Sequence, residues 1–328
     1  MRDESIATVS VRDMMRARDA RLERQQMLLR GGGSSLICFT MNIAGPVKNN
    51  RKIRMGFCEA KEDIVRRLEY GGIHVLRQEE VCASTGNEWY GVTDGAAYRV
   101  KRLMTEIEER DDFGRLLDID VLDEAGAKIE RTALGFPPRA CLICGAAGGG
   151  CASSRAHSAK ELYHRAMDIL AEHLTFRQVD RIAELACRAL LHEVCVTPKP
   201  GLVDRTNSGA HSDMDIFTFA ASAAALTPYL RGCALTGARM AEEPPERTLE
   251  ALRGAGQSAQ DDMLRATGGV NTHKGAIYLM GLLCAAAGRL CAGEEEFSIE
   301  RAGELCAEMT AGELDRLTQT GRAPSGAK

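Results

Sequence analysis

The sequence predicts an α+β domain followed by an all-α domain, and three observations lead to this fold class. Short runs of alternating apolar and polar residues occur only before about residue 140. Segments with apolar residues at helical spacing are interleaved with these runs, as in domains whose helices cover a small sheet. After residue 158 the strand-like runs disappear, and helical patterns rich in Ala and Leu follow one another. We therefore expect a first domain over 1–172 with a small mixed sheet, and a helical second domain over 176–328.

The first domain is expected to contain strands and helices in alternation. The strands are predicted, in chain order, at 35–43, 72–81, 88–94 and 116–121. The helices are predicted at 11–30, 59–70 and 98–110. In the last of these helices the apolar side chains recur every three or four positions, at Val100, Leu103, Met104 and Ile107.

The second domain is expected to consist of helices alone. They are predicted at 159–174, 177–194, 215–230, 247–266, 274–291 and 298–317. A short linker around Thr175 is expected to separate the first two. The longest apolar stretch, 275–288, is shorter than a bilayer-spanning helix requires, so we expect a buried helix there.

Charge and cysteine usage restrict the class of protein. The net charge is −4, so no overall basic field favours a nucleic-acid partner. The first residues are charged throughout and contain no apolar segment of the kind found in export signals. The twelve cysteines are scattered along the chain, which favours a reducing cytoplasm in which most thiols are small core residues. We expect a cytoplasmic protein that binds neither nucleic acid nor membrane.

Two aspartates one residue apart, in "GRLLDIDVLD" (114–123), are the first candidates for a site. In a strand, Asp118 and Asp120 lie on one face and the intervening apolar residues on the other. Neighbouring carboxylates repel each other unless a cation lies between them, so a Mg²⁺ site is one interpretation. The alternative is an edge strand with a solvated polar face. Glu106 and Glu108 are weaker candidates for a third carboxylate, because helical spacing puts them on different faces.

A basic segment, "NIAGPVKNNRKIR" (42–54), suggests what such a metal would hold. A Gly-Pro turn is followed there by Lys48 and three further cations, which by themselves are typical of a solvated loop. Beside an Asp-x-Asp strand, Lys48 and Arg115 suit a phosphate chain, because carboxylates bind Mg²⁺ and basic side chains neutralise a leaving pyrophosphate. The combination predicts a nucleotidyltransferase-like site with Asp118, Asp120, Arg115 and Lys48 as its catalytic residues.

A cysteine-rich segment at 141–157 predicts a zinc knuckle. Its candidate ligands form the tetrahedral Cys₃His set of a structural zinc site, although the gap between the second and third is short: Cys141, Cys144, Cys151 and His157. The alternative is a chance C-x-x-C pair, with the histidine on the surface before a helix capped by Ser158 and Glu161. A zinc-knuckle adaptor for nucleic acid is the competing function, which the acidic net charge and the scarcity of aromatic residues disfavour.

Five motifs of the first domain resemble those of holo-citrate lyase synthase, the apo-citrate lyase phosphoribosyl-dephospho-CoA transferase. They are "RDARLERQ" (18–25), "GPVK" (45–48), "GRLLDIDV" (114–121), "PPRACLIC" (137–144) and "CASSRAH" (151–157). The resemblance implies transfer of a phosphoribosyl-dephospho-CoA group to a serine of the acyl-carrier (γ) subunit of citrate lyase, with release of pyrophosphate. It also implies substrate-binding roles for Arg18, Arg21 and Gly45.

Two polar loops of the second domain form a further set of candidates. Each loop precedes a helix, with Asp213 as an expected N-cap and the second helix start suited to an anion. Either loop alone is typical of a capped helix, but together "PKPGLVD…NSGAHSDMD" and "GVNTHKGA" resemble triphosphoribosyl-dephospho-CoA synthase. That resemblance implies that ATP and dephospho-CoA are joined with release of adenine, and that the substrates are bound by Lys199, Asp204, Asn207, His211, Asp213, Asp215, Asn271, His273 and Lys274.

The synthase family is longer than the segment that follows residue 176. We therefore expect a partial synthase domain with impaired donor synthesis, fused to a complete transferase domain. In the alternative, the protein is a transferase only and its helical part serves as a docking surface.

Overall fold

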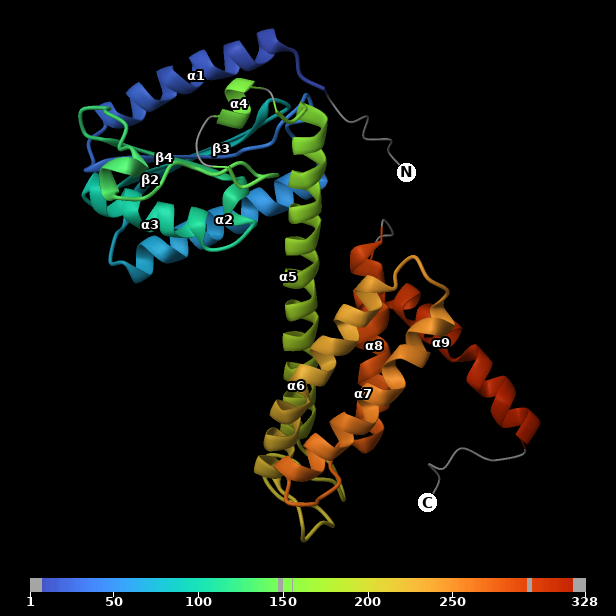
Figure 1. Cartoon of the computed structure of the whole chain (residues 1–328). Coiled ribbons are helices and arrows are strands. Elements are labelled where there is room, and N and C mark those ends of the chain that lie inside the picture. Colours follow the sequence, from blue (N-terminus) through green and yellow to red (C-terminus); the bar gives the residue numbers. More distant parts are fainter. Residues whose placement is uncertain (1–7, 147–149, 155, 294–296, 321–328) are drawn as a thin grey trace. The chain divides into compact units, whose positions relative to one another are not determined.

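The computed structural model divides the chain into two compact units, Met1–Leu174 and Thr175–Lys328 (Figure 1). The structure describes residues 8–146, 150–154, 156–293 and 297–320. Each unit has its own cluster of buried apolar side chains. The predicted fold class is confirmed, because the first unit contains a small sheet with helices and the described part of the second unit is helical.

The first unit is built on a four-stranded sheet in the order β2-β3-β1-β4. The strands are β1 (Ser35–Met41), β2 (Val75–Ala83), β3 (Gly86–Thr93) and β4 (Leu117–Asp123). All three pairings are antiparallel, so the sheet is antiparallel rather than mixed. The other elements are α1 (Val11–Arg30), α2 (Arg51–Tyr70), α3 (Ala97–Glu109), η1 (Gly114–Leu116), η2 (Arg131–Leu134), α4 (Gly150–Ser154) and the first half of α5 (Ala159–Cys195).

The two faces of the sheet are covered by different helices. Figure 1 shows α1 on one side and α2 and α3 on the other. The face toward α2 and α3 carries the main core, in which Phe39 of β1 stacks on Phe57 of α2 with ring centroids 4.9 Å apart. The face toward α1 has a smaller apolar cluster around Cys38 and Tyr90, against which Leu28 of α1 packs.

Helix α2 begins eight residues before the predicted position, and this changes the interpretation of the basic segment. Asn50 is the N-cap, and its side chain accepts a hydrogen bond of 2.8 Å from the backbone N–H of Ile53. Arg51 and Arg54 are therefore exposed positions on a helix rather than members of a loop. Of the cations in that segment, Lys48 alone remains in the turn.

The predicted linker at Thr175 is wrong, because α5 runs without interruption from Ala159 to Cys195. The segment contains neither Gly nor Pro, and a single β-branched threonine lowers helix propensity by only a few tenths of a kcal/mol, about 0.5 at most. The helix contributes Leu170 to the core of the first unit and Leu190 to that of the second.

The second unit contains the rest of α5 together with α6 (Ile216–Arg239), α7 (Pro245–Ala266), α8 (Lys274–Ala292) and α9 (Ile299–Thr320). Helices α6 and α8 pack backbone against backbone. A Cβ atom added at Gly237 would come within 2.0 Å of the carbonyl oxygen of Ala285, and one at Gly288 within 2.0 Å of that of Ala234. Glycine at these two positions therefore permits the close approach of the helices.

Helix α8 is longer than the apolar stretch on which the prediction rested. Its 19 residues are apolar enough to cross a membrane by length and composition alone, and 56% of the relevant window is buried in the unit. Ile277, Leu282 and Ala285 belong to the apolar cluster of the second unit, as expected for the core helix of a globular unit.

The prediction that most cysteines are small core residues is only partly confirmed. All twelve thiols are free, but Cys38, Cys233 and Cys284 alone are buried.

Candidate active sites and metal centre

The two aspartates of the Asp-x-Asp strand lie on one face of β4. Leu117, Ile119 and Val121 are buried in the main core, whereas Asp118 is exposed and Asp120 is half-buried, so the predicted alternation is confirmed. Their face is the one that α1 covers, because Asp120 lies opposite Cys38 of β1 in the antiparallel register. In the next row of the sheet, Asp118 lies opposite Thr40 of β1, and Thr40 opposite Glu88 of β3.

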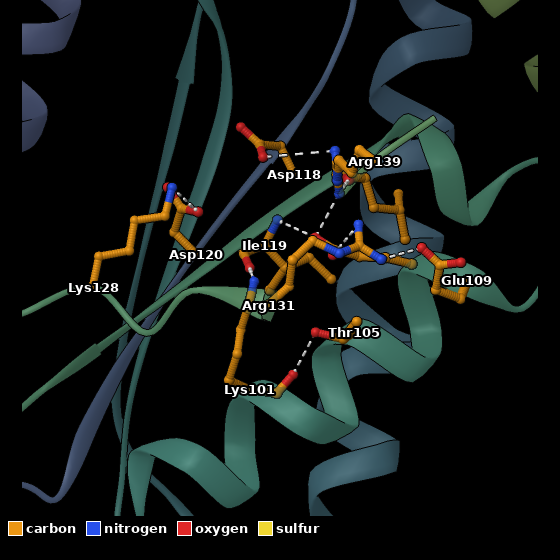
Figure 2. Close-up of polar contacts among 11 residues, drawn as sticks. Lys101, Thr105, Glu109, Asp118, Ile119, Asp120, Lys128, Arg131 and Arg139 are labelled. Atoms are coloured by element: carbon orange, nitrogen blue, oxygen red, sulfur yellow. Dashed lines mark hydrogen bonds and ion pairs between the residues drawn. The ribbon is translucent and has the colours of Figure 1, made fainter. Parts of the chain in front are cut away.

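Each aspartate has a cationic neighbour (Figure 2). The Oδ1 atom of Asp120 lies 2.8 Å from Nζ of Lys128, and Oδ1 of Asp118 lies 3.8 Å from Nη1 of Arg139. Half of the Asp118 side chain and a third of the Asp120 side chain are exposed. The carboxylates are thus accessible to a ligand, and the adjacent cations reduce their mutual repulsion.

A small cavity of about 140 Å³ brings together three of the predicted site residues, Arg21, Lys48 and Asp118. Arg21 reaches it from α1 and forms an ion pair of 2.6 Å with the buried Glu88. The Lys48 ammonium donates a hydrogen bond to the carbonyl of Ile43, and burial lowers its pKa. The cavity therefore combines two cations, Arg21 and Lys48, with two carboxylates, Glu88 and Asp118, and Glu88 is the one paired with Arg21.

The first resemblance also implied substrate-binding roles for Arg18 and Gly45, and neither residue lines this cavity. Arg18 is exposed on α1. Gly45 has a φ of +79°, a left-handed conformation that favours glycine, and it forms the turn that leads to Lys48.

A buried cluster on α3 fixes the strand segment between the two aspartates. The Oε1 atom of Glu108 accepts a hydrogen bond of 2.9 Å from the N–H of Ile119, and Nζ of Lys101 donates one of 2.6 Å to the carbonyl of Ile119. Because β4 is an edge strand, these side chains satisfy backbone groups for which the sheet supplies no partner. Glu108 also pairs with Arg139 at 2.6 Å. Burial raises the pKa of Glu108 and lowers that of Lys101.

Sequence reasoning underestimated this cluster. It ranked Glu108 low and did not select Lys101, Arg131 or Arg139. Lys101, Thr105 and Glu108 recur at positions i, i+4 and i+7 of α3, and all three are buried. Such a polar row beside the apolar row of a helix was the signal available. Glu106, by contrast, is on the outer side and pairs with Arg67 at 2.8 Å.

A larger cavity of about 750 Å³ lies beside the start of β4. Arg115 lines this cavity and not the smaller one, so the structure does not bring Arg115 and Lys48 together as the sequence predicted. Arg131 and Arg139 also line it, as do Cys141 and His157 of the cysteine-rich segment. The two cavities share Asn42 as a lining residue.

The cysteine-rich segment forms a compact cluster. One ligand atom each from Cys141, Cys144, Cys151 and His157 lies within 4.8 Å of the others. The Sγ atoms of Cys144 and Cys151 are 3.2 Å apart. Hydrogen bonding with His157 is the main reason that the pKa of the Cys144 thiol falls to about 6. The Nε2 atom of His157 is buried and has no hydrogen-bond partner in the described part of the chain. The predicted capping box of Ser158 and Glu161 follows directly.

In the second unit the loop before α6 is organised around one buried carboxylate, Asp204. It accepts hydrogen bonds from the hydroxyls of Thr197 and Thr206 and from the backbone N–H of Asn207, and these bonds hold its pKa well below the usual range. Asp204 thus shapes the loop and has little capacity left for a substrate. The ammonium of Lys199 donates to Glu193 at 2.9 Å.

The N-cap of α6 is Asp215, not the predicted Asp213. The Asp215 carboxylate accepts a hydrogen bond from the backbone N–H of Thr218. In return, the Thr218 hydroxyl oxygen accepts one from the backbone N–H of Asp215, and the two bonds form a capping box. A cap at Asp213 would have Ile216 as the reciprocating residue, and isoleucine cannot accept that bond. Asp213 is instead exposed, with its Oδ1 atom 4.0 Å from Nδ1 of His211.

The second polar loop lies at the same end of the helical unit as the first (Figure 1). His273 is 5% exposed, and its Nδ1 atom is 2.7 Å from the hydroxyl of Ser222. Burial lowers the pKa of His273, and its Nε2 atom has no hydrogen-bond partner in the described part of the chain.

The other two candidates of this loop lie at the start of α8, where Asn271 accepts a hydrogen bond from the N–H of Lys274. Lys274 lines a separate cavity of about 270 Å³ with Gln257. The structure therefore places His273 in the core and Lys274 at a cavity.

The fold and these sites define a protein with an α+β unit followed by a helical unit, each with its own candidate site. Residues 9–173 match the family described as apo-citrate lyase phosphoribosyl-dephospho-CoA transferase, and residues 179–324 match that described as ATP:dephospho-CoA triphosphoribosyl transferase. The chain belongs to the family in which these two units are fused.

Individual relatives agree with this assignment. The chain is 34% identical over 315 residues to Protein CitXG of Haemophilus influenzae, an alignment that covers 94% of this chain and 67% of the relative. It is 35% identical over 256 residues to Protein CitXG of Leuconostoc mesenteroides, covering 75% and 54%. It is 52% identical over 114 residues to 2-(5''-triphosphoribosyl)-3'-dephosphocoenzyme-A synthase of Klebsiella pneumoniae, covering 35% and 38%. The chain thus spans about two thirds of the first relative and about half or less of the other two.

Proposed function

We propose that the first unit transfers phosphoribosyl-dephospho-CoA from its triphosphate donor to a serine of the citrate lyase acyl-carrier subunit, and that the second unit makes this donor from ATP and dephospho-CoA. Family membership supports both activities. The observation that carries the first is the position of Asp118, which lies on the exposed part of β4 and lines a cavity with Lys48 and Arg21.

The chemistry of the transfer follows from these side chains. The serine oxygen forms a bond to the phosphorus nearest the ribose, the bond from that phosphorus to the pyrophosphate oxygen breaks, and the serine proton goes to solvent. Lys48 and Arg21 supply positive charge where the leaving pyrophosphate gains negative charge. Asp118 and Asp120 share a strand face and are partly exposed, which fits the oxygen ligands that Mg²⁺ prefers. Mg²⁺ held there would neutralise phosphate charge.

Mass spectrometry of the apo acyl-carrier subunit tests the proposed transfer. The full chain is incubated with that subunit and the preformed triphosphoribosyl donor. We expect the serine-containing peptide to gain the mass of one phosphoribosyl-dephospho-CoA group while pyrophosphate is released. A carrier subunit that keeps its mass would contradict the proposal. In parallel, adenine released from ATP in the presence of dephospho-CoA measures the second activity.

The Cys/His cluster is proposed to bind one structural zinc ion. Four ligand atoms within 4.8 Å of one another, and an imidazole Nε2 atom without a partner, fit a tetrahedral Zn²⁺. Four protein ligands leave no open position for a substrate, so the ion would hold the segment in place beside Arg115, which donates a 2.6 Å hydrogen bond to the carbonyl of Cys141.

Metal analysis of protein purified without chelator is expected to give close to one equivalent of zinc. Because metal binding is coupled to folding, Cys144→Ser should reduce both the zinc content and the melting temperature. Cys195→Ser, at an exposed thiol outside the cluster, is the matched control and should change neither. Wild-type protein prepared under reducing conditions that contains no zinc would refute this assignment.

A cytoplasmic location suits these activities. The substrates are nucleotides, and the twelve cysteines are free thiols, as is usual in a reducing compartment.

A further inference from the structure

We infer that the larger cavity of the first unit binds the dephospho-CoA part of the donor through its diphosphate, and that the smaller cavity receives the leaving pyrophosphate. The larger cavity is the one that Arg115, Arg131 and Arg139 line, and the smaller is the one that Lys48 and Arg21 line. The inference rests on the proposed transfer and assigns the two ends of the donor to two places in the structure.

The sizes of the cavities support this division. Pockets that enclose ligands of nucleotide size usually have volumes of about 300–1,000 Å³. The larger cavity, at about 750 Å³, is within that range, and the smaller, at about 140 Å³, is below it. A pyrophosphate ion has few atoms and needs much less space than dephospho-CoA. The bulky part of the donor therefore fits only the larger of the two.

The arginines of the larger cavity have hydrogen-bonding capacity left for a diphosphate. Arg115 and Arg139 are each about one-third exposed, at 32% and 31%. In the described part of the chain, the nearest acidic partners of their Nη1 atoms are Asp112, 3.9 Å from Arg115, and Asp118, 3.8 Å from Arg139, and both distances are beyond hydrogen-bond range. A phosphate oxygen can take these N–H groups in the geometry that guanidinium groups prefer.

The third arginine offsets the acidic side chains of the same cavity. Arg131 is 10% exposed and pairs with Glu109 and, at 3.9 Å, with Glu108. Its Nε and Nη1 atoms are buried without hydrogen-bond partners in the described part of the chain. Arg131 therefore supplies charge rather than a direct contact. With three arginines and two glutamates on its wall, the cavity is left with positive charge for an anion.

Apolar residues provide the rest of the wall. Pro137, Pro138, Leu142 and Leu162 line the cavity together with Ala159 at the first turn of α5. Such surfaces suit the adenine ring and the pantetheine chain, which carry no charge. The positive end of the α5 helix dipole adds to the attraction for phosphate.

The two cavities are neighbours, and the carboxylate that we assign to catalysis lines the smaller one on the side near Arg139. Arg139 lines the larger cavity and lies beside Asp118, which lines the smaller (Figure 2). Asn42 lines both. A donor that extends from one cavity to the other would place the phosphate nearest its ribose at Asp118, with dephospho-CoA on one side and pyrophosphate on the other.

Hydrogen–deuterium exchange of the full chain, read by peptide, tests the assignment with dephospho-CoA and pyrophosphate as separate probes. The local readout is needed because the second unit is also proposed to bind dephospho-CoA. We expect dephospho-CoA to slow exchange at residues 139–142 and 157–162. Pyrophosphate is expected to slow it at residues 45–49 and 85–88. Titration of each probe gives its Kd at each segment.

Two variants perturb the larger cavity in different ways. Arg139→Gln removes a charge, and Ala140→Trp places an indole at an exposed lining position while every arginine is kept. Each should raise the Kd for dephospho-CoA at 139–142 about tenfold or more. Arg139→Gln removes one charge-assisted hydrogen bond, and Ala140→Trp fills part of the space that the nucleotide needs. The Kd for pyrophosphate at 45–49 should not change. Arg102→Gln, on the exposed side of α3, is the control and should change neither.

The outcomes separate this inference from the proposed function. Three results would overturn the inference even in an active transferase. Pyrophosphate alone could protect 139–142, dephospho-CoA could fail to protect this segment, or dephospho-CoA could protect it in both variants as well as in the wild-type protein. Absence of transfer to the acyl-carrier subunit, with the expected protection present, would overturn the proposed function and leave the nucleotide site standing.

Discussion

Asp118→Asn and Asp120→Asn are each expected to lower the rate of transfer to the acyl-carrier subunit by a factor of about 10² or more, the size of effect seen when a transition state loses a key electrostatic group. Asparagine has the shape of aspartate but cannot supply the negative charge that a bound Mg²⁺ needs. The measurement is the initial rate of modification of the carrier serine, by mass spectrometry, at saturating donor.

Stability should be little affected in these two variants. Asp118 and Asp120 are partly exposed, and exposed ion pairs contribute about 0–1 kcal/mol. Glu124→Gln, an exposed position just after β4, is the matched control and should keep the wild-type rate. Normal turnover in both aspartate variants would instead support the solvated edge strand, the other interpretation of the alternating pattern.

Glu108→Ala is expected to lower the free energy of unfolding by about 3–5 kcal/mol, the cost of removing one partner from a buried ion pair. The side chain is 3% exposed and pairs with Arg139 at 2.6 Å. Its loss would leave Arg139 and the buried Lys101 without their compensating carboxylate and would leave the N–H of Ile119 without an acceptor. Denaturant unfolding of the first unit, followed by the fluorescence of Trp89 in its core, measures the change.

The matched control is on the same helix. Glu106→Ala removes a carboxylate that is 40% exposed and pairs with Arg67, so we expect a change of about 1 kcal/mol or less. Equal destabilisation by the two substitutions would show that Glu108 does not anchor β4. Since Glu108 holds the segment between Asp118 and Asp120, to which we assign the catalytic role, Glu108→Ala should also reduce transfer under conditions in which the protein remains folded.

Local patterns determined much of the fold. The alternation in β4 predicted which side chains are buried, because successive residues of a strand face opposite sides wherever the strand lies. The capping box of Ser158 and Glu161 and the bounds of α1 were predictable because they depend on residues a few positions apart. The failures among the elements were also local: Asn50 was overlooked as a cap, and Thr175 was taken for a break in a segment without Gly or Pro.

The sequence by itself determined the types of residue available for chemistry: a pair of carboxylates, a turn with Lys48, and a Cys₃His set of candidate metal ligands. Only the tertiary structure decided how they are grouped. The order β2-β3-β1-β4 makes β4 an edge strand, so that Lys101 and Glu108 of α3 bond to both backbone groups of Ile119. The fold also places Arg115 and Lys48 in different cavities. Periodicity records which face of an element is buried, whereas the partner on that face is set by packing between segments far apart in the chain.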